Sequence, residues 1–158
     1  MAVTKGKEQA RRVFANYCKK TNETVGGAQV KSSDGKQYVG NHFMICRYVD
    51  KVDGLEQADR LVDFKKYIDE LGLTLHMPYC LDDIKPVSGS DNKLCTLGKS
   101  GICYDYIALK KMLKTFGQIQ DFGINQDSKL MGKGCYALLI KDTDGNEGFI
   151  LALRPKKD

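Results

Sequence analysis

The last third of the chain, residues 104–155, constrains the fold more than any other stretch. Tyr104 to Phe116 carries apolar side chains at helical spacing, Asp105 is a typical N-cap residue, and Gly117 follows the last apolar position. These signals predict a short helix. The run Gln118–Ile124 then predicts a short strand.

A hairpin of two apolar strands ends this stretch. Cys135–Lys141 and Glu147–Arg154 flank Asp142–Asn146, whose Asp, Gly and Asn residues are typical of a turn. Both faces of these strands are apolar, which a hairpin with one solvated face would not tolerate. We therefore expect one face to meet the core and the other a second layer or another subunit. The 135–154 hairpin is thus a candidate homo-oligomer interface.

The first 50 residues predict one helix and two strands. Lys7 to Lys20 has one apolar stripe at helical spacing and a basic outer side, which is typical of an amphipathic helix. Ala28–Ser32 and Lys36–Arg47 predict two strands joined at Ser33-Asp34-Gly35, because glycine accepts the positive φ of a tight turn. The second run is nearly continuous in apolar residues, which indicates a central strand covered on both faces.

The middle of the chain predicts one more helix and then an irregular stretch. Asp53 and Glu56 have the spacing of a capping box, and apolar residues recur at helical spacing until Gly72. Leu73–Met77 predicts a short strand that ends at a proline. Residues 78–103 show no clear periodicity, so they predict either an ordered functional loop or a mobile insertion.

Together these elements predict an α+β fold of three helices packed on a mostly antiparallel sheet, with an irregular loop at residues 78–103. A chain of 158 residues fits a single domain, residues 1–158, and can bury a core without disulfides. No apolar run approaches the roughly 18 residues needed to span a bilayer, and the first residues lack the apolar segment of a signal peptide. We therefore expect a cytoplasmic protein with no membrane partner.

Positive charge is concentrated in the first third of the chain. The net charge is +5, and residues 1–54 hold ten Lys and Arg residues against five Asp and Glu residues. On two of the predicted helices, basic residues lie off the apolar stripe and therefore face outward. A solvated helix surface explains this pattern, and so does a face that meets nucleic acid or an acidic partner. The candidate nucleic-acid-binding residues are Arg11, Arg12, Lys19, Lys20, Lys110, Lys111 and Lys114.

Cysteine and histidine residues offer a different chemistry. His76, Cys80, Cys95 and Cys103 form a candidate zinc site, because zinc accepts nitrogen and sulfur ligands in a tetrahedral arrangement. Their spacings match no standard paired zinc motif, and buried unligated cysteines are the alternative. A Cys–His nucleophile pair using His42 or His76 is formally present, but nothing local selects one pair. We therefore assign no catalytic residue and expect no cofactor, with zinc as the alternative.

Residues 104–155 also resemble part of a known protein family. Tyr104-Asp-Tyr-Ile-Ala-Leu-Lys-Lys-Met-Leu-Lys-Thr-Phe-Gly117, Tyr136-Ala-Leu-Leu-Ile140 and Gly148-Phe-Ile-Leu-Ala-Leu-Arg-Pro155 are similar to the closing half of a domain of the bacterial DNA polymerase sliding clamp. The resemblance implies a helix-on-sheet fold that encircles DNA with its basic helices facing inward. By this resemblance the residues that face DNA are Lys110, Lys111 and Lys114, joined by Arg11, Arg12, Lys19 and Lys20 on the first helix.

The leading functional hypothesis is a small non-enzymatic accessory protein that meets nucleic acid, or a nucleic-acid-handling protein, through its basic helices. The absence of familiar enzyme motifs fits an accessory protein of a phage or mobile element. The alternative is a small enzyme or zinc-stabilised protein that uses His76 with Cys80, Cys95 and Cys103. A protein–protein inhibitor or scaffold is the third hypothesis.

Overall fold

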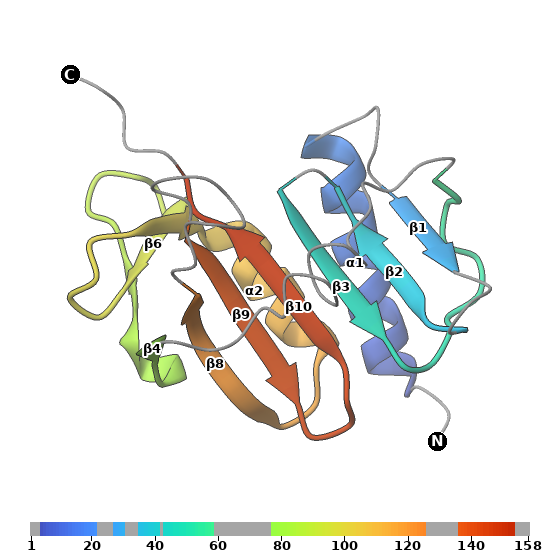
Figure 1. Ribbon diagram of the computed structural model, residues 1–158. Helices are drawn as coiled ribbons and strands as arrows, with labels where there is room; N and C mark the ends of the chain where they lie inside the picture. The colour runs from blue at the N-terminus through green and yellow to red at the C-terminus, as the bar shows by residue number, and fades with distance from the viewer. Residues whose placement is uncertain are drawn as a thin grey trace.

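The protein is built on one large antiparallel sheet that carries two helices on one face (Figure 1). The computed structural model describes residues 4–21, 27–30, 35–41, 43–58, 77–125 and 136–153. Within these ranges the chain forms two α-helices, ten strands and one short 3-10 helix. Seven strands form the large sheet in the order β1-β2-β3-β10-β9-β8-β4, and three form a second antiparallel sheet in the order β5-β6-β7.

Two units with the same order of elements, one helix followed by three strands, make up most of the large sheet. The first unit consists of α1 (Lys5–Thr21), β1 (Gly27–Val30), β2 (Gln37–Gly40) and β3 (Met44–Tyr48). The second consists of α2 (Tyr106–Thr115), β8 (Ile119–Asn125), β9 (Ala137–Asp142) and β10 (Glu147–Leu151). Each unit is an antiparallel meander, and the two units join through their third strands, where Arg47 of β3 lies opposite Glu147 of β10.

The segment between the two units forms the edge of the large sheet and all of the small one. It contains β4 (Met77–Pro78), the 3-10 helix η2 (Leu81–Asp83), β5 (Ile84–Pro86), β6 (Leu94–Leu97) and β7 (Cys103–Asp105). β4 pairs with β8, and β7 leads directly into α2.

The main core lies between the helices and the large sheet. Phe14 and Cys18 of α1 and Leu109 and Met112 of α2 are fully buried there against alternate residues of the strands. Gly148 of β10 lets α2 approach closely, since a Cβ atom at this position would lie 2.9 Å from the Phe116 ring and 3.0 Å from Met112 Sδ. This helix therefore packs tightly on the sheet.

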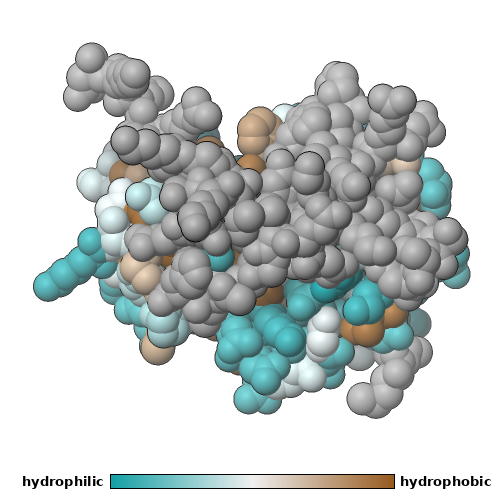
Figure 2. All heavy atoms as spheres, viewed as in Figure 1, coloured by the Kyte–Doolittle hydropathy of each residue, from teal (hydrophilic) through white to brown (hydrophobic). Residues whose placement is uncertain are grey.

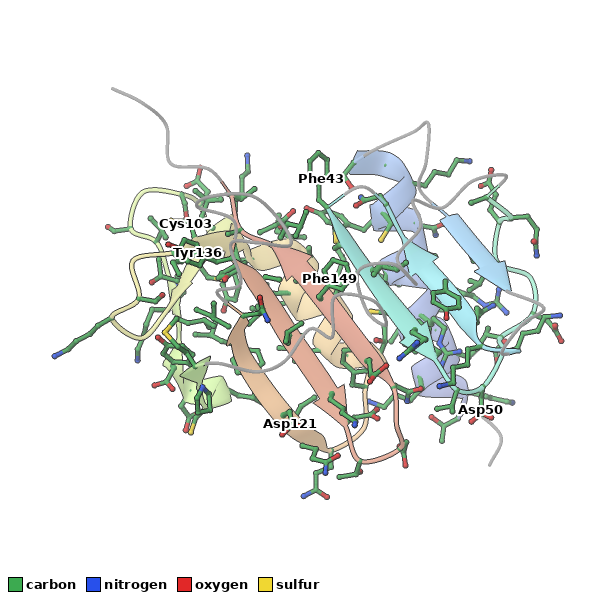
Figure 3. The ribbon with its side chains drawn as sticks, in the orientation of Figure 1. Phe43, Asp50, Cys103, Asp121, Tyr136 and Phe149 are labelled. Carbon is green, nitrogen blue, oxygen red and sulfur yellow. The ribbon has the colours of Figure 1, made fainter. Side chains whose placement is uncertain are left out.

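The opposite face of the sheet has its own apolar cluster. Tyr38, Ile45 and Phe149 are at most 1% exposed, and Leu139 and Leu151 pack beside them. Phe149 lies in the middle of the face turned to the viewer (Figure 3), and the same view with all atoms shows hydrophilic residues gathered at the end that holds the β9–β10 turn (Figure 2). Both faces of the β9–β10 hairpin are thus buried in one chain, and its edges pair with β8 and β3, so its burial requires no second copy.

Short-range signals predicted α1, α2, β8 and the β9–β10 hairpin correctly. The Asp105 carboxylate accepts a 3.0 Å hydrogen bond from the backbone N–H of Ala108 and caps α2. In the last turn, the buried Asp142 carboxylate accepts hydrogen bonds from the backbone N–H groups of Asp144 (3.0 Å) and Asn146 (2.9 Å). Each of these contacts spans four residues or fewer, which is why the sequence reveals them.

The prediction of three helices on one sheet is wrong. The described residues contain two α-helices, and residues 53–58, which should begin the predicted helix, form a turn and an isolated bridge to β1. Gly54 has a φ of +80°, which is incompatible with a right-handed helix. The backbone N–H of Ala28 donates to Glu56 O at 3.0 Å, and Ala58 N–H donates to Ala28 O at 2.9 Å. The remainder of that predicted helix lies outside the described residues, as do residues 73–76 of the strand expected at Leu73–Met77; its last residue, Met77, begins the edge strand β4.

The prediction of an irregular loop at residues 78–103 is also wrong. This stretch forms η2 and the strands of the small sheet, with Ile84 opposite Leu97 and Thr96 opposite Cys103. The polar run before Lys93 is the turn between β5 and β6. Asp91 and Asn92 adopt left-handed φ values of 54° and 59°, which Asp and Asn tolerate better than most residues.

The single long strand expected at Lys36–Arg47 is two strands. Asn41 interrupts it, because the Asn41 Oδ1 atom accepts hydrogen bonds from the backbone N–H groups of Phe43 (2.8 Å) and Met44 (3.2 Å). The chain reverses there, and β2 pairs with β3 in a hairpin. The expected coverage on both faces is correct for β3, since Cys46 faces the helices and Ile45 the opposite cluster.

Candidate nucleic-acid interface

The two helices lie side by side and antiparallel, which brings distant parts of the sequence together. Near the start of α1, the Lys7 ammonium donates to the carbonyl oxygens of Lys114 (3.1 Å) and Phe116 at the end of α2. At the other end of the pair, the Tyr17 hydroxyl donates to the Asp105 carboxylate at 2.6 Å. Asp105 therefore both caps α2 and connects it to α1.

The buried stripes of both helices decide which side chains face outward. In α1 the residues Arg11, Phe14, Ala15 and Cys18 point inward, and in α2 the inward residues are Ala108, Leu109, Met112 and Thr115. We call the outward side of the pair the helix-pair surface. It consists of Lys5, Gln9, Val13, Asn16, Tyr17 and Lys20 from α1 and Ile107, Lys110, Lys111 and Lys114 from α2.

Lysines from both helices make the helix-pair surface cationic. Lys5, Lys20, Lys110 and Lys114 are exposed, and Lys111 is half-buried. The Lys110 ammonium lies 4.5 Å from the centre of the Tyr106 ring, and that of Lys111 lies 5.8 Å from the centre of the Tyr17 ring. Among the residues that the structure describes, no carboxylate forms an ion pair with any of these five lysines.

Three of the seven predicted binding residues are engaged elsewhere. Arg12 Nη2 lies 2.6 Å from the Glu8 carboxylate and donates to Asp53 O at 2.7 Å. Lys19 Nζ lies 2.5 Å from the Glu56 carboxylate. Both cations are therefore neutralised at the side of α1, away from α2.

Arg11 is the third, and it lies in the core. Only 2% of this residue is exposed, and its guanidinium stacks 3.7 Å above the centre of the Tyr48 ring. Its Nη1 atom donates to Asp50 O at 2.6 Å and to Gln37 Oε1 at 3.2 Å, while Nε has no partner within the described part of the chain. Burial lowers the pKa of the Arg11 guanidinium, an effect that Tyr48, Cys46 and Asp50 oppose. Arg11 cannot reach a ligand at the surface.

Sequence reasoning missed Lys5 and the groove between the helices. Lys5 shares one side of α1 with Gln9 and Val13, and this i, i+4 spacing is the signal that could have placed it on the surface. The groove has a volume of about 630 Å³. We call its apolar and aromatic lining residues, Val13, Tyr17 and Ile107, the floor, and the remaining lining residues are Asn16, Lys20, Thr21 and Lys111. The groove depends on the packing of two helices far apart in the sequence, so no local pattern could reveal it.

Tyr17 holds a fixed position in this groove. Its hydroxyl is bonded to Asp105, and burial together with this hydrogen bond raises the pKa of Tyr17 above its ordinary value. The hydroxyl consequently stays protonated at neutral pH and keeps donating to Asp105.

The predicted zinc ligands do not come together in the described residues. Those residues contain no group of three or more His, Cys, Asp or Glu side chains that could hold a metal ion. Cys80 is exposed before η2, Cys95 is fully buried, and Cys103 lies opposite Thr96, so its side chain points away from that of Cys95. His76, the fourth predicted ligand, lies outside the described residues, as do His42 and Cys135.

Three cysteines have an environment that opposes nucleophilic chemistry. Burial raises the pKa of Cys46 and of Cys95 from the ordinary value of 9.0 to about 12, and it raises the pKa of Cys18 as well. A catalytic thiol needs a lowered pKa in a partly open site, because the thiolate is the reactive form.

Alkylation should separate the buried thiols from the exposed one. At pH 8, a thiol with a pKa of about 12 has about a thousand-fold less thiolate than one with a pKa of 9.0, which lowers the reactivity of Cys46 and Cys95. Burial also keeps the reagent away from both thiols. We expect both to react with iodoacetamide at least about 100-fold more slowly than Cys80, and to react readily in urea. Peptide mass mapping over a time course measures this. Equal rates in the folded protein would show that these thiols are accessible.

Comparisons of this chain with protein-family models, curated proteins and solved structures found no match. The resemblance of residues 104–155 to a sliding-clamp domain therefore stays a prediction. Within the ranges that the structure describes, no helix combines the length and the apolar character needed to cross a membrane.

Proposed function

We propose that this protein is a non-enzymatic nucleic-acid-binding protein that holds the phosphate backbone on its helix-pair surface. The observation that carries the proposal is that Lys20 and Lys111, about 90 residues apart in the sequence, line one groove, while Lys110 and Lys114 lie exposed on the same helix as Lys111. Within the described residues these lysines form no ion pair with a carboxylate, and neighbouring cations that are not paired attract a polyanion. Phosphates are the dominant contacts of proteins that bind nucleic acid without sequence preference.

The contacts between the helices support this proposal, because they fix the cations in place. Lys7 and Tyr17 connect the two helices at the two ends of the pair, and the close contact of Gly148 with Met112 packs α2 against the sheet. Of the carboxylates near the pair, Glu8 forms an ion pair with Arg12, and Asp105 accepts hydrogen bonds from Tyr17 and from the backbone of α2. Neither forms an ion pair with a lysine of the helix-pair surface.

Neutralising the four lysines should abolish salt-sensitive binding. If Lys20, Lys110, Lys111 and Lys114 each contact one phosphate, log K for a single strand falls with log [salt] with a slope of about −2.8, so affinity drops roughly 50-fold between 50 and 200 mM salt. In the variant Lys20→Gln/Lys110→Gln/Lys111→Gln/Lys114→Gln the slope should approach zero. Fluorescence anisotropy of a labelled 20-nucleotide oligomer over a salt series measures both slopes.

A matched control removes the same number of charges elsewhere. Lys85, Lys93, Lys99 and Lys141 are exposed and belong to neither helix. The variant Lys85→Gln/Lys93→Gln/Lys99→Gln/Lys141→Gln has the same net charge as the first variant. This control should keep most of the wild-type slope. No binding by the wild-type protein at low salt, or an equal loss in both variants, would refute the proposal. Circular dichroism establishes that both variants are folded.

A further inference from the structure

The floor of the groove between α1 and α2 is not explained by phosphate binding alone. Val13 is 38% exposed, although it is a large apolar residue on a cationic surface, and Ile107 of α2 lines the same groove. Phosphates make no favourable contact with such a floor. A ligand that places an apolar group between two negative charges can contact both the apolar and the cationic lining residues.

We infer that the groove accepts an unstacked base of a single-stranded nucleic acid, while Lys20 and Lys111 hold the phosphates on either side of it. This inference rests on the proposed function and names its substrate class. A volume of about 630 Å³ lies within the range of roughly 300–1,000 Å³ that is typical of small-ligand pockets. Asn16 adds an amide at the edge of the groove, where base edges carry hydrogen-bonding groups.

Tyr17 provides a rigid face for the base. The hydrogen bond from its hydroxyl to Asp105 restricts the ring, so little side-chain entropy is lost when a base packs on it. Aromatic side chains beside a cationic track are the general arrangement for binding single strands. The Lys111 ammonium lies over the Tyr17 ring, 5.8 Å from its centre, and so brings positive charge to this aromatic side chain.

The same features disfavour a duplex. In a double helix the bases are stacked and paired, so only their edges are presented to a protein. A base reaches Val13, Tyr17 and Ile107 only after it has left the stack, and this is free or nearly free in a single strand. A duplex can therefore use the lysines but not the floor of the groove.

Three probes of equal length separate the base from the phosphates. The probes are a labelled oligothymidine 20-mer, a 20-mer of the same backbone with abasic sites, and a 20-base-pair duplex. We expect the wild-type protein to bind the oligothymidine about 10-fold or more tightly than the abasic strand, which is the scale of one stacked base. The duplex should also bind more weakly than the oligothymidine at the same salt concentration.

A variant of the floor is the second part of the experiment. Val13→Asn, with or without Ile107→Asn, leaves every lysine in place, and Val13 is exposed enough for the single change to be tolerated by the fold. It should bring the affinity for oligothymidine closer to that for the abasic strand while leaving the salt slope unchanged. Equal binding of oligothymidine and abasic strand by the wild-type protein, with a steep salt slope, overturns this inference and leaves the proposed function standing.

Two further outcomes would also refute the inference. If no probe binds at 20 mM salt, both the proposed function and the inference fail. If an amphipathic helical peptide with Leu residues on one face and Glu residues on the other binds and the nucleic acids do not, and Val13→Asn weakens binding of the peptide, the groove is a protein-docking site instead.

Discussion

Replacing Gly40 by alanine is expected to lower the free energy of unfolding by at least about 3 kcal/mol, the upper part of the range for overpacked sites. A Cβ atom at this position would overlap the carbonyl oxygen of Met44 and lie 2.8 Å from Ile45 Cα. Both are backbone atoms of the paired strand, so no side-chain rotation relieves the overlap. The Gly40–Ile45 pair at the closed end of the β2–β3 hairpin would have to separate.

The change at Gly40 should also reach the helix-pair surface. Asn41 follows Gly40, and its Nδ2 atom donates to Cys18 O at 3.1 Å and to Thr21 Oγ1 at 2.9 Å, at the end of α1. The hairpin therefore positions the last turn of α1, which carries Lys20. We expect Gly40→Ala to weaken oligonucleotide binding as well as stability.

Gly6→Ala is the matched control for this prediction. A Cβ atom at Gly6 meets no atom within 4 Å, and alanine is favoured over glycine inside a helix by about 1 kcal/mol. Urea denaturation followed by circular dichroism should show a lower midpoint for Gly40→Ala and an equal or higher one for Gly6→Ala. Equal midpoints for both variants and the wild-type protein would contradict the close approach of β2 and β3.

The parts of the fold that were predictable from the sequence depend on neighbours in the chain. The Asp105 cap, the stripe of α1 and the turn around Asp142 involve residues within a few positions of one another. Asp53 and Glu56 show the limit of this reasoning. They have the spacing of a capping box, but Gly54 takes a left-handed φ and Glu56 O accepts a hydrogen bond from the first strand of the sheet. A partner 28 residues away therefore outweighs the local helix signal.

The repeated order of helix and three strands has no counterpart in the sequence. The inward position Arg11 of α1 is filled by a charged residue, whereas α2 turns apolar residues such as Met112 toward the sheet. A backbone arrangement can recur while its core is filled by different side chains, provided that volume and burial are satisfied. The repeat is therefore visible in the topology of the two units but not in their amino-acid sequences.

The candidate site was predictable in part. The positions of Lys110, Lys111 and Lys114 follow from the period of α2 alone, and Lys20 follows from that of α1. Periodicity does not show which cations form ion pairs with carboxylates of other segments, as Lys19 does with Glu56. It also cannot show that α1 and α2 lie side by side, and the groove exists only because they do.

Arg11→Ala is expected to lower the free energy of unfolding by about 3 kcal/mol, because hydrogen bonds from a charged donor contribute roughly 1.5–3 kcal/mol each. The change leaves Asp50 O without its guanidinium donor and removes the group that stacks on Tyr48. Gln37 Oε1 keeps a second donor, the backbone N–H of Val52 at 3.2 Å, so part of the network survives. Urea denaturation measures the loss.

Arg12→Ala separates this buried role from a role in binding. Arg12 is the next residue of the same helix, and its partly exposed pair with Glu8 is worth about 0.5 kcal/mol or less, so the stability of this variant should stay close to that of the wild-type protein. Because Arg11 is buried, folded Arg11→Ala protein should keep the wild-type salt slope for oligonucleotide binding. If Arg11→Ala were as stable as Arg12→Ala and had a shallower salt slope, Arg11 would be a surface contact, as the helical pattern of the sequence predicts, and the helix-pair surface would have to include it.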